Sequence, residues 1–178
     1  MNSAMQPVSA TASAASVAVM GTASPAVIST VTDAELPIAN RVVADSIGSW
    51  GIAQRVQRLT LPYLLYDAAD LQHMSLVMTH RGGSGLAVAA WEDHLGGHSD
   101  SRDALLHGLY VTPSWQRHGL GSNLLEYASR EIRARGFDGL LAKVWRESTA
   151  FFFARGFRPA TGSASEGLYP IQMWKALQ

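Results

Sequence analysis

The sequence predicts an α/β fold in which helices flank a mixed central sheet, and two patterns carry that prediction. An apolar strand over 105–111 leads through a glycine-bearing turn into an amphipathic helix from Leu120, and a second apolar strand follows over 139–144. Because a strand, crossover helix, strand unit makes its two strands parallel, this segment forms a parallel part of the sheet. The glycine-rich turn over 81–85 joins two further apolar runs as a hairpin, which makes another part antiparallel.

Several local signals set the boundaries in the first half of the domain. Thr32 and Glu35 have the spacing of a capping box at the start of a helix, and Pro62 breaks a later helix. In chain order we expect a strand over 26–31, a helix to about Ser46, a second helix over 49–58, strands over 75–79 and 86–91, and a polar loop over 92–103.

The second half shows one strongly amphipathic helix between the two parallel strands. Its apolar stripe consists of Leu120, Leu124, Ala128 and Ile132, and Gly136 supplies a stop after it. After the strand over 139–144 we expect a short helix over 148–155 that holds three phenylalanines, and a last strand over 171–175.

Length and composition favour one domain with a sizeable core. The chain has 178 residues and is 47% hydrophobic, and we expect residues 1–25, rich in Ala, Ser and Thr, to be a flexible tail before a single domain over 26–178. Lys plus Arg and Asp plus Glu number 14 each, so no global field attracts nucleic acid or an anionic membrane. The absence of cysteine excludes disulfides and thiolate chemistry.

No targeting or membrane-spanning segment is recognisable in the sequence. No Lys or Arg precedes Arg41, whereas a signal peptide begins with basic residues, and no apolar run reaches about 18 residues. We therefore expect a cytoplasmic protein with no membrane partner. An organellar transit peptide would be rich in Arg, which this segment is not, but the sequence leaves that question open.

The turn over 116–122 has the features of a phosphate-binding loop. A helix start leaves backbone N–H groups without partners and carries partial positive charge, so an anion gains hydrogen bonds there. Gly119 and Gly121 remove the Cβ atoms that would block close approach. The loop is not a Walker A loop, which needs Lys where Leu120 stands, nor a dinucleotide fingerprint, which needs Gly or Ala at Leu124. An ordinary tight turn is the alternative.

Gln116-x-x-Gly119-x-Gly121, placed directly after a strand that ends at Val111, resembles the pyrophosphate-binding motif of the GCN5-related N-acetyltransferases, the GNAT family. The short helix that runs into Gly156-Phe157 resembles the closing segment of that family's core, and the resemblance covers about residues 27 to 175. It implies a GNAT-like sheet with splayed parallel strands that form an acyl-CoA cleft. It also implies direct transfer of an acetyl group from acetyl-CoA to a primary amine of a small molecule or peptide.

The resemblance further implies which residues hold the coenzyme. The main chain of Leu109 and Val111 would meet the pantetheine arm and the thioester carbonyl. The loop that would bind the pyrophosphate comprises Gln116, Arg117, His118, Gly119, Leu120, Gly121 and Ser122. Arg117 and His118 are candidates for side-chain contacts, and a solvated loop charge is the alternative for Arg117.

Acylation needs a neutral amine, and a lysine-like amine with a pKa of ~10.4 costs about 4.6 kcal/mol to deprotonate at neutral pH. His107 is our first candidate for the base, because alternation along the strand puts it on the same face as Leu109 and Val111. A bulge in this strand would reverse that facing, and a buried histidine bonded to a carbonyl is the alternative. Glu92 and Asp93, acting through water, are second choices, and surface charge is their simpler explanation.

The family often has a tyrosine, four residues before the Gly of Gly-Phe, that protonates the departing thiolate. Phe152 stands there and cannot donate, so either Tyr110 or water supplies the proton, and the Phe152 ring is a candidate to flank the coenzyme. This departure sustains a second hypothesis, a GNAT-like module that binds acyl-CoA without turnover.

Two further clusters contain residue types that can bind ligands. The loose spacing of His94, His98, Asp100 and Asp103 predicts no metal site. Trp50, Tyr63 and Tyr66 fall where the family covers its acceptor, although a core role is expected for at least two of them. The acceptor amine, the acyl chain length and the oligomeric state, including a homodimer, stay open.

Overall fold

The computed structural model describes residues 25–94, 102–164 and 171–177. The strands of this part are β1 (Val27–Thr30), β2 (Ser75–Arg81), β3 (Ser84–His94), β4 (Asp103–Val111), β5 (Gly139–Val144), β6 (Arg158–Ala164) and β7 (Ile171–Ala176). The helices are α1 (Leu36–Gly48), α2 (Gln54–Thr60), α3 (Asp70–His73), α4 (Leu120–Ala134) and α5 (Thr149–Ala154). The predicted tail lies outside the described residues except for Pro25.

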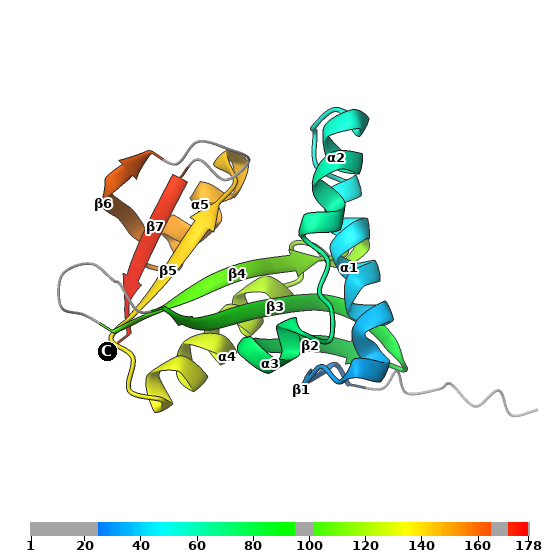
Figure 1. Ribbon diagram of the computed structural model, residues 1–178, viewed down its shortest axis with the longest axis horizontal. Helices are drawn as coiled ribbons and strands as arrows, with labels where there is room; N and C mark the ends of the chain where they lie inside the picture. Colours follow the sequence, from blue (N-terminus) through cyan, green and yellow to red (C-terminus); the bar gives the residue numbers. More distant parts are fainter. Residues whose placement is uncertain (1–24, 95–101, 165–170, 178) are drawn as a thin grey trace, which may run out of the picture.

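The strands form one mixed sheet in the order β1-β2-β3-β4-β5-β7-β6 (Figure 1). β4 and β5 are parallel, and the other neighbouring pairs are antiparallel. The predicted fold class is therefore confirmed, because α4 connects the parallel pair as its crossover helix.

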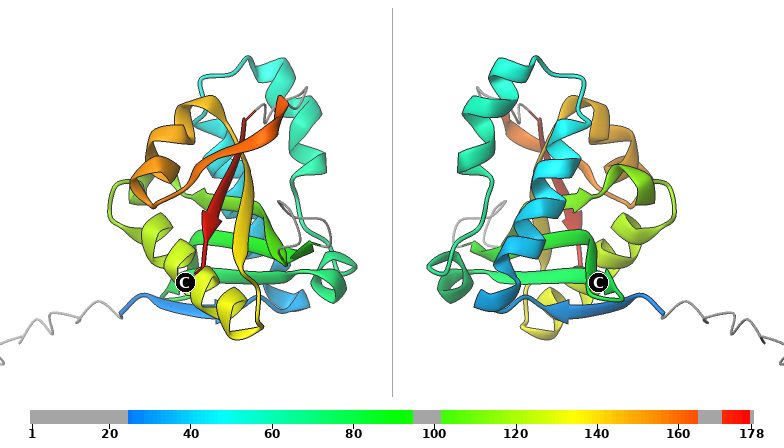
Figure 2. Two further views of the ribbon diagram at one scale, coloured as in Figure 1. Left: turned by 90° about the vertical axis from the view of Figure 1, so that its left-hand side faces the viewer. Right: turned by 90° about the vertical axis from the view of Figure 1, so that its right-hand side faces the viewer.

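Helices α1 and α4 pack against opposite faces of the sheet, as Figures 1 and 2 show. The predicted stripe on α4 is confirmed, since Leu124, Ala128 and Ile132 are at most 1% exposed and Leu120 is 9% exposed. These side chains join a core with Phe157 and Met173. On the other face, the core contains α1 side chains such as Val43 and Ile47. Two apolar layers thus fix the sheet between the helices.

Three of the local sequence signals act as expected. The Glu35 carboxylate accepts hydrogen bonds from the backbone N–H (3.0 Å) and the hydroxyl (2.8 Å) of Thr32, which closes the capping box ahead of α1. Gly136 follows α4 with φ of 80°, a conformation that ends a helix at little cost for glycine. Gly82 and Gly83 take φ of 55° and 80° at the β2–β3 hairpin, as a two-residue turn of this kind requires.

The predicted second helix begins five residues too early. Residues 49–53 are not helical, and α2 begins at Gln54. The Gln57 side-chain amide donates to the carbonyls of Trp50 and Ile52, both at 3.1 Å, so this segment satisfies its backbone without a helix. Pro62 does end the helical run, which closes in a short 3-10 turn, Leu61–Tyr63.

The loop prediction over 92–103 is partly wrong, because β3 extends to His94 and pairs with Asp103 at the start of β4. His98 and Asp100 lie outside the described residues. Two elements were not predicted, α3 and β6. α3 is too short for a periodic pattern, and β6 contains Pro159, which is tolerated because β6 lies at the edge of the sheet.

Candidate active site

The parallel strands β4 and β5 separate at the carboxyl end of the sheet. Their pairing ends at Leu106 and Ala142, although β4 continues to Val111 and β5 to Val144. β4 stays paired with β3, while β5 stays paired with β7, so each strand follows a different neighbour (Figure 1). A cleft of about 750 Å³ lies beyond the point of separation and is lined from β4, the loop before α4, and α5.

The backbone of β4 is open toward this cleft. Thr112 N–H donates to the Leu86 carbonyl of β3 at 3.0 Å. Because backbone groups alternate in direction along a strand, those of Leu109 and Val111 point away from β3 and toward the gap. The Val111 carbonyl accepts a hydrogen bond from the Gln116 side-chain amide at 3.3 Å. Leu109 and Val111 both line the cleft.

The start of α4 faces the same cleft. Gly119 is the N-cap with φ of 83°, and no side chain caps the helix. The first helical hydrogen bond runs from Asn123 N–H to the Gly119 carbonyl at 3.0 Å, so the N–H groups of Leu120, Gly121 and Ser122 have no helical acceptor. These three residues line the cleft. The geometry can hold an anion through backbone N–H groups.

The two glycines of the loop contribute in different ways. Gly119 requires its positive φ, whereas Gly121 lies inside α4, where a Cβ would stand 3.6 Å from Phe151 and Val111. A Cβ at Gly121 would thus make only ordinary van der Waals contacts with these two side chains, and the φ of Gly121 is not positive. Arg117 also has a positive φ, 63°, which the sequence did not indicate.

The loop side chains divide between the cleft and solvent. Gln116 and Arg117 line the cleft. His118 does not, because its Nδ1 lies 2.8 Å from the Gln116 carbonyl and its ring packs against Trp115 with centroids 5.6 Å apart.

His107 and Glu92, proposed separately from the sequence, lie together. His107 Nε2 is 2.8 Å from Glu92 Oε1, and their side chains are 34% and 33% exposed. His107 is therefore not a buried core histidine. Asp93 is exposed.

The predicted facing of His107 is wrong, and the reason is a bulge. Trp91 pairs with Leu106 and Ala90 with Gly108, which leaves His107 unpaired between them. Alternation is interrupted there, so His107 meets Glu92 on the α1 side, while Leu109 and Val111 pack against the core on the α4 side.

Aromatic rings bridge the gap between the separated strands. Trp50 stacks on Tyr110 of β4 and on Trp145, which directly follows β5, with centroids 6.4 and 6.0 Å apart. All three rings line a small pocket together with His107 and Phe152. Sequence reasoning missed Trp145, although its place at the carboxyl end of a parallel strand is a signal for a site residue.

The other aromatic residues singled out from the sequence differ in how deeply they are buried. Tyr66 is buried and Trp50 packs partly against the core on the α1 side, whereas Tyr63 is 87% exposed. Phe152 is 7% exposed and makes edge contacts with Phe151 and Phe157.

Within the described ranges, no cluster of three His, Asp or Glu side chains could hold a metal ion. No helix in that part of the chain has both the length and the apolar character needed to cross a bilayer.

The sheet, its separated parallel strands and the uncapped helix define an acetyltransferase fold, and comparisons support this. Residues 74–159 match the family model of the acetyltransferase (GNAT) domain. This region, which holds β2 to α5, belongs to the GNAT family, as the sequence motif indicated. No curated protein was found to match the chain.

Solved structures share the fold at low sequence identity. A PaiA N-acetyltransferase from Thermoplasma acidophilum, in complex with coenzyme A, is 14% identical with a TM-score of 0.71, covering 85% of this chain and 99% of that one. The ribosomal-protein-S18-alanine N-acetyltransferase from Escherichia coli is 21% identical with a TM-score of 0.61, covering 86% and 94%. The family and the fold together support acyl transfer from an acyl-coenzyme A in general.

Proposed function

We propose that this chain is an N-acetyltransferase that moves an acetyl group from acetyl-CoA to a primary amine of a small molecule or peptide. The observation that carries the proposal is the meeting of the open β4 backbone with the uncapped start of α4 in one cleft. The backbone N–H groups of 120–122 suit a pyrophosphate, and Leu109 and Val111 offer backbone groups to an extended amide-bearing arm.

In this proposal, the coenzyme supplies a thioester whose C–S bond breaks as the amine nitrogen bonds to the acyl carbon. His107 takes the proton that the amine loses. If Nε2 carries the hydrogen that the Glu92 carboxylate accepts, Nδ1 is left as the basic nitrogen. Glu92 orients the ring, so Glu92 is a positioning residue.

Protonation of the leaving thiolate does not need a tyrosine at position 152. A free thiol has a pKa of about 8.5, so water can supply the proton at neutral pH. Tyr110 is a second source, because its ring lines the same pocket as His107.

A specific observation also favours a second candidate function. The ring of Phe152 is buried where the family often has a proton donor, and this suits a module that binds acyl-CoA without turnover. The two functions differ in whether bound acetyl-CoA is consumed.

Calorimetric titration with acetyl-CoA, followed by a thiol-release screen against a library of amines, tests the proposal. Binding with release of free thiol for some amine supports the enzyme. Binding without release for any amine supports the binding module, and the absence of binding contradicts both.

A further inference from the structure

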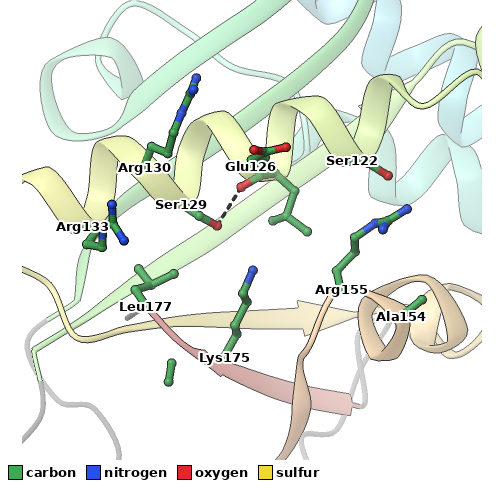
Figure 3. A pocket seen from close by; sticks show the side chains of 11 residues that line it. Ser122, Glu126, Ser129, Arg130, Arg133, Ala154, Arg155, Lys175 and Leu177 are labelled. Atoms are coloured by element: carbon green, nitrogen blue, oxygen red, sulfur yellow. Dashed lines mark hydrogen bonds between the residues drawn. The ribbon is translucent and has the colours of Figure 1, made fainter.

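A second groove, of about 420 Å³, lies between α4 and β7 (Figure 3). α4 contributes Ser122, Arg130 and Arg133, while Arg155 follows α5 and Lys175 comes from β7. In Figure 3 the Lys175 side chain extends from β7 toward α4, and Arg155 extends toward Ser122.

The groove is cationic. Four basic side chains line it against one carboxylate, that of Glu126. Arg155 and Lys175 make no ion pair with any carboxylate of the described residues. Instead, Arg155 lies over the Phe151 ring at 5.8 Å, and Lys175 lies over Phe157 at 6.0 Å. The chain has no net charge, so this local excess is a property of the groove rather than of the whole surface.

The groove continues from the candidate active site. Ser122 and Arg155 line both cavities, so the end of the proposed pyrophosphate cradle opens directly onto the groove. With the pantetheine arm along β4 and the pyrophosphate at the start of α4, the next part of a coenzyme A molecule, the adenosine with its 3′-phosphate, reaches this region.

We infer that Lys175 and Arg155 bind the 3′-phosphate of the coenzyme and make the protein select coenzyme A over dephospho-coenzyme A. The inference rests on the proposed function, which it deepens by adding a specificity residue, Lys175, that lines only the groove. A phosphate monoester is a compact dianion that suits a groove lined by an ammonium and a guanidinium from two elements. Arg155 lines both cavities, whereas Lys175 lines only the groove and therefore contacts no part of the coenzyme except the 3′-phosphate.

Calorimetric titration of the full chain with coenzyme A and with dephospho-coenzyme A tests the inference. We expect coenzyme A to bind about tenfold tighter, as a few partly exposed charge pairs allow, and this ratio to shrink at high salt. Equal dissociation constants for the two ligands would overturn the inference while leaving the proposed function intact. Failure of both ligands to bind would overturn the proposed function as well.

The Lys175→Met variant assigns the effect to one side chain, because Met keeps the aliphatic stem against Phe157. It should bring the ratio of the two dissociation constants close to one, whereas Arg155→Met should weaken both ligands. Arg41→Met, which removes an exposed charge from α1, is the matched control and should keep the ratio. A ratio unchanged in Lys175→Met would contradict the assignment.

Inorganic phosphate separates the coenzyme's phosphate from a free phosphate ligand. We expect millimolar phosphate at constant ionic strength to leave the ratio of the two dissociation constants unchanged, because any phosphate in the pyrophosphate cradle weakens both ligands alike. A ratio that falls toward one as phosphate is added would mean that the groove is a general phosphate site, against the inference.

Discussion

The Nε2 atom of His107 lies 2.8 Å from Oε1 of Glu92, although alternation along β4 would have turned the histidine to the opposite face. The bulge between Leu106 and Gly108 produces this contact at the point where β4 and β5 separate. The histidine that we propose as the base therefore lies against a carboxylate and lines the small pocket between the separated strands.

Replacement of the base should slow turnover and change its pH dependence. We expect His107→Gln to lower kcat/KM for the amine by about 10²–10⁴, the usual contribution of a general base, and to remove the fall in rate at acidic pH. Steady-state kinetics over a pH series measures both effects. His73→Gln, on the exposed surface of α3, is the control. An unchanged rate and profile in His107→Gln would show that another group takes the proton.

Glu92→Gln should also slow turnover, but by less than His107→Gln does. The neutral amide holds the ring less firmly than the carboxylate that now lies 2.8 Å from Nε2, so we expect kcat to fall with KM for acetyl-CoA unchanged. Kinetics with each substrate varied in turn resolves the two constants. A rise in KM for acetyl-CoA with normal kcat would instead place Glu92 in coenzyme binding.

Gly119 and Gly83 offer a matched pair of substitutions. Both have φ near 80° with open space where a Cβ would stand, so Gly119→Val and Gly83→Val should each destabilise the fold by at least about 1–2 kcal/mol. Only Gly119→Val should abolish acetyl-CoA binding, because only Gly119 is the N-cap of α4, next to the free backbone N–H groups. Thermal unfolding and calorimetry measure the two effects. Retained coenzyme affinity in folded Gly119→Val would exclude the loop as the pyrophosphate site.

Restoring a phenol at position 152 tests how the thiolate is protonated. If water supplies the proton, Phe152→Tyr should change kcat at pH 7 by less than about threefold and raise it only above the thiol pKa of about 8.5. Phe153→Tyr, at a position 45% exposed, is the control for an added hydroxyl. A large gain at pH 7 in Phe152→Tyr alone would show that proton donation limits turnover.

The capping box makes stability depend on pH on the acidic side. Hydrogen bonds from the backbone and then the hydroxyl of Thr32 lower the pKa of Glu35 below its ordinary value of 4.5. A lowered pKa in the folded state stabilises the protein above that ordinary value, and the stabilisation is lost as pH falls through the folded pKa. Urea unfolding should show Glu35→Gln less stable than the parent at pH 7, with the difference disappearing at the lowest pH. Asp45→Asn, in the helix α1 that follows the capping box, is the control. A difference independent of pH would mean that the carboxylate charge plays no part.

Local patterns determined much of the fold. The apolar stripe from Leu120 to Ile132 needs only a period of 3.6 residues to be recognised, and the parallel arrangement of β4 and β5 follows from the handedness of a crossover. The glycine-bearing loop before α4 was also predictable, because a glycine at a helix start after a strand is defined within a few residues. Two other segments could not be predicted from local patterns. Residues 49–53 are not helical and accept hydrogen bonds from the Gln57 side chain, and β6 pairs with β7, which lies further along the chain.

The sequence by itself determined which residues could bind an anion or accept a proton, because residue type and local spacing decide those properties. Tertiary structure alone decided which of them meet. The bulge at His107 depends on the register of two paired strands, and the Trp50–Trp145 stack joins residues almost a hundred positions apart. Likewise, Arg155 and Lys175 line one groove with α4, an arrangement that depends on long-range packing rather than on any local pattern.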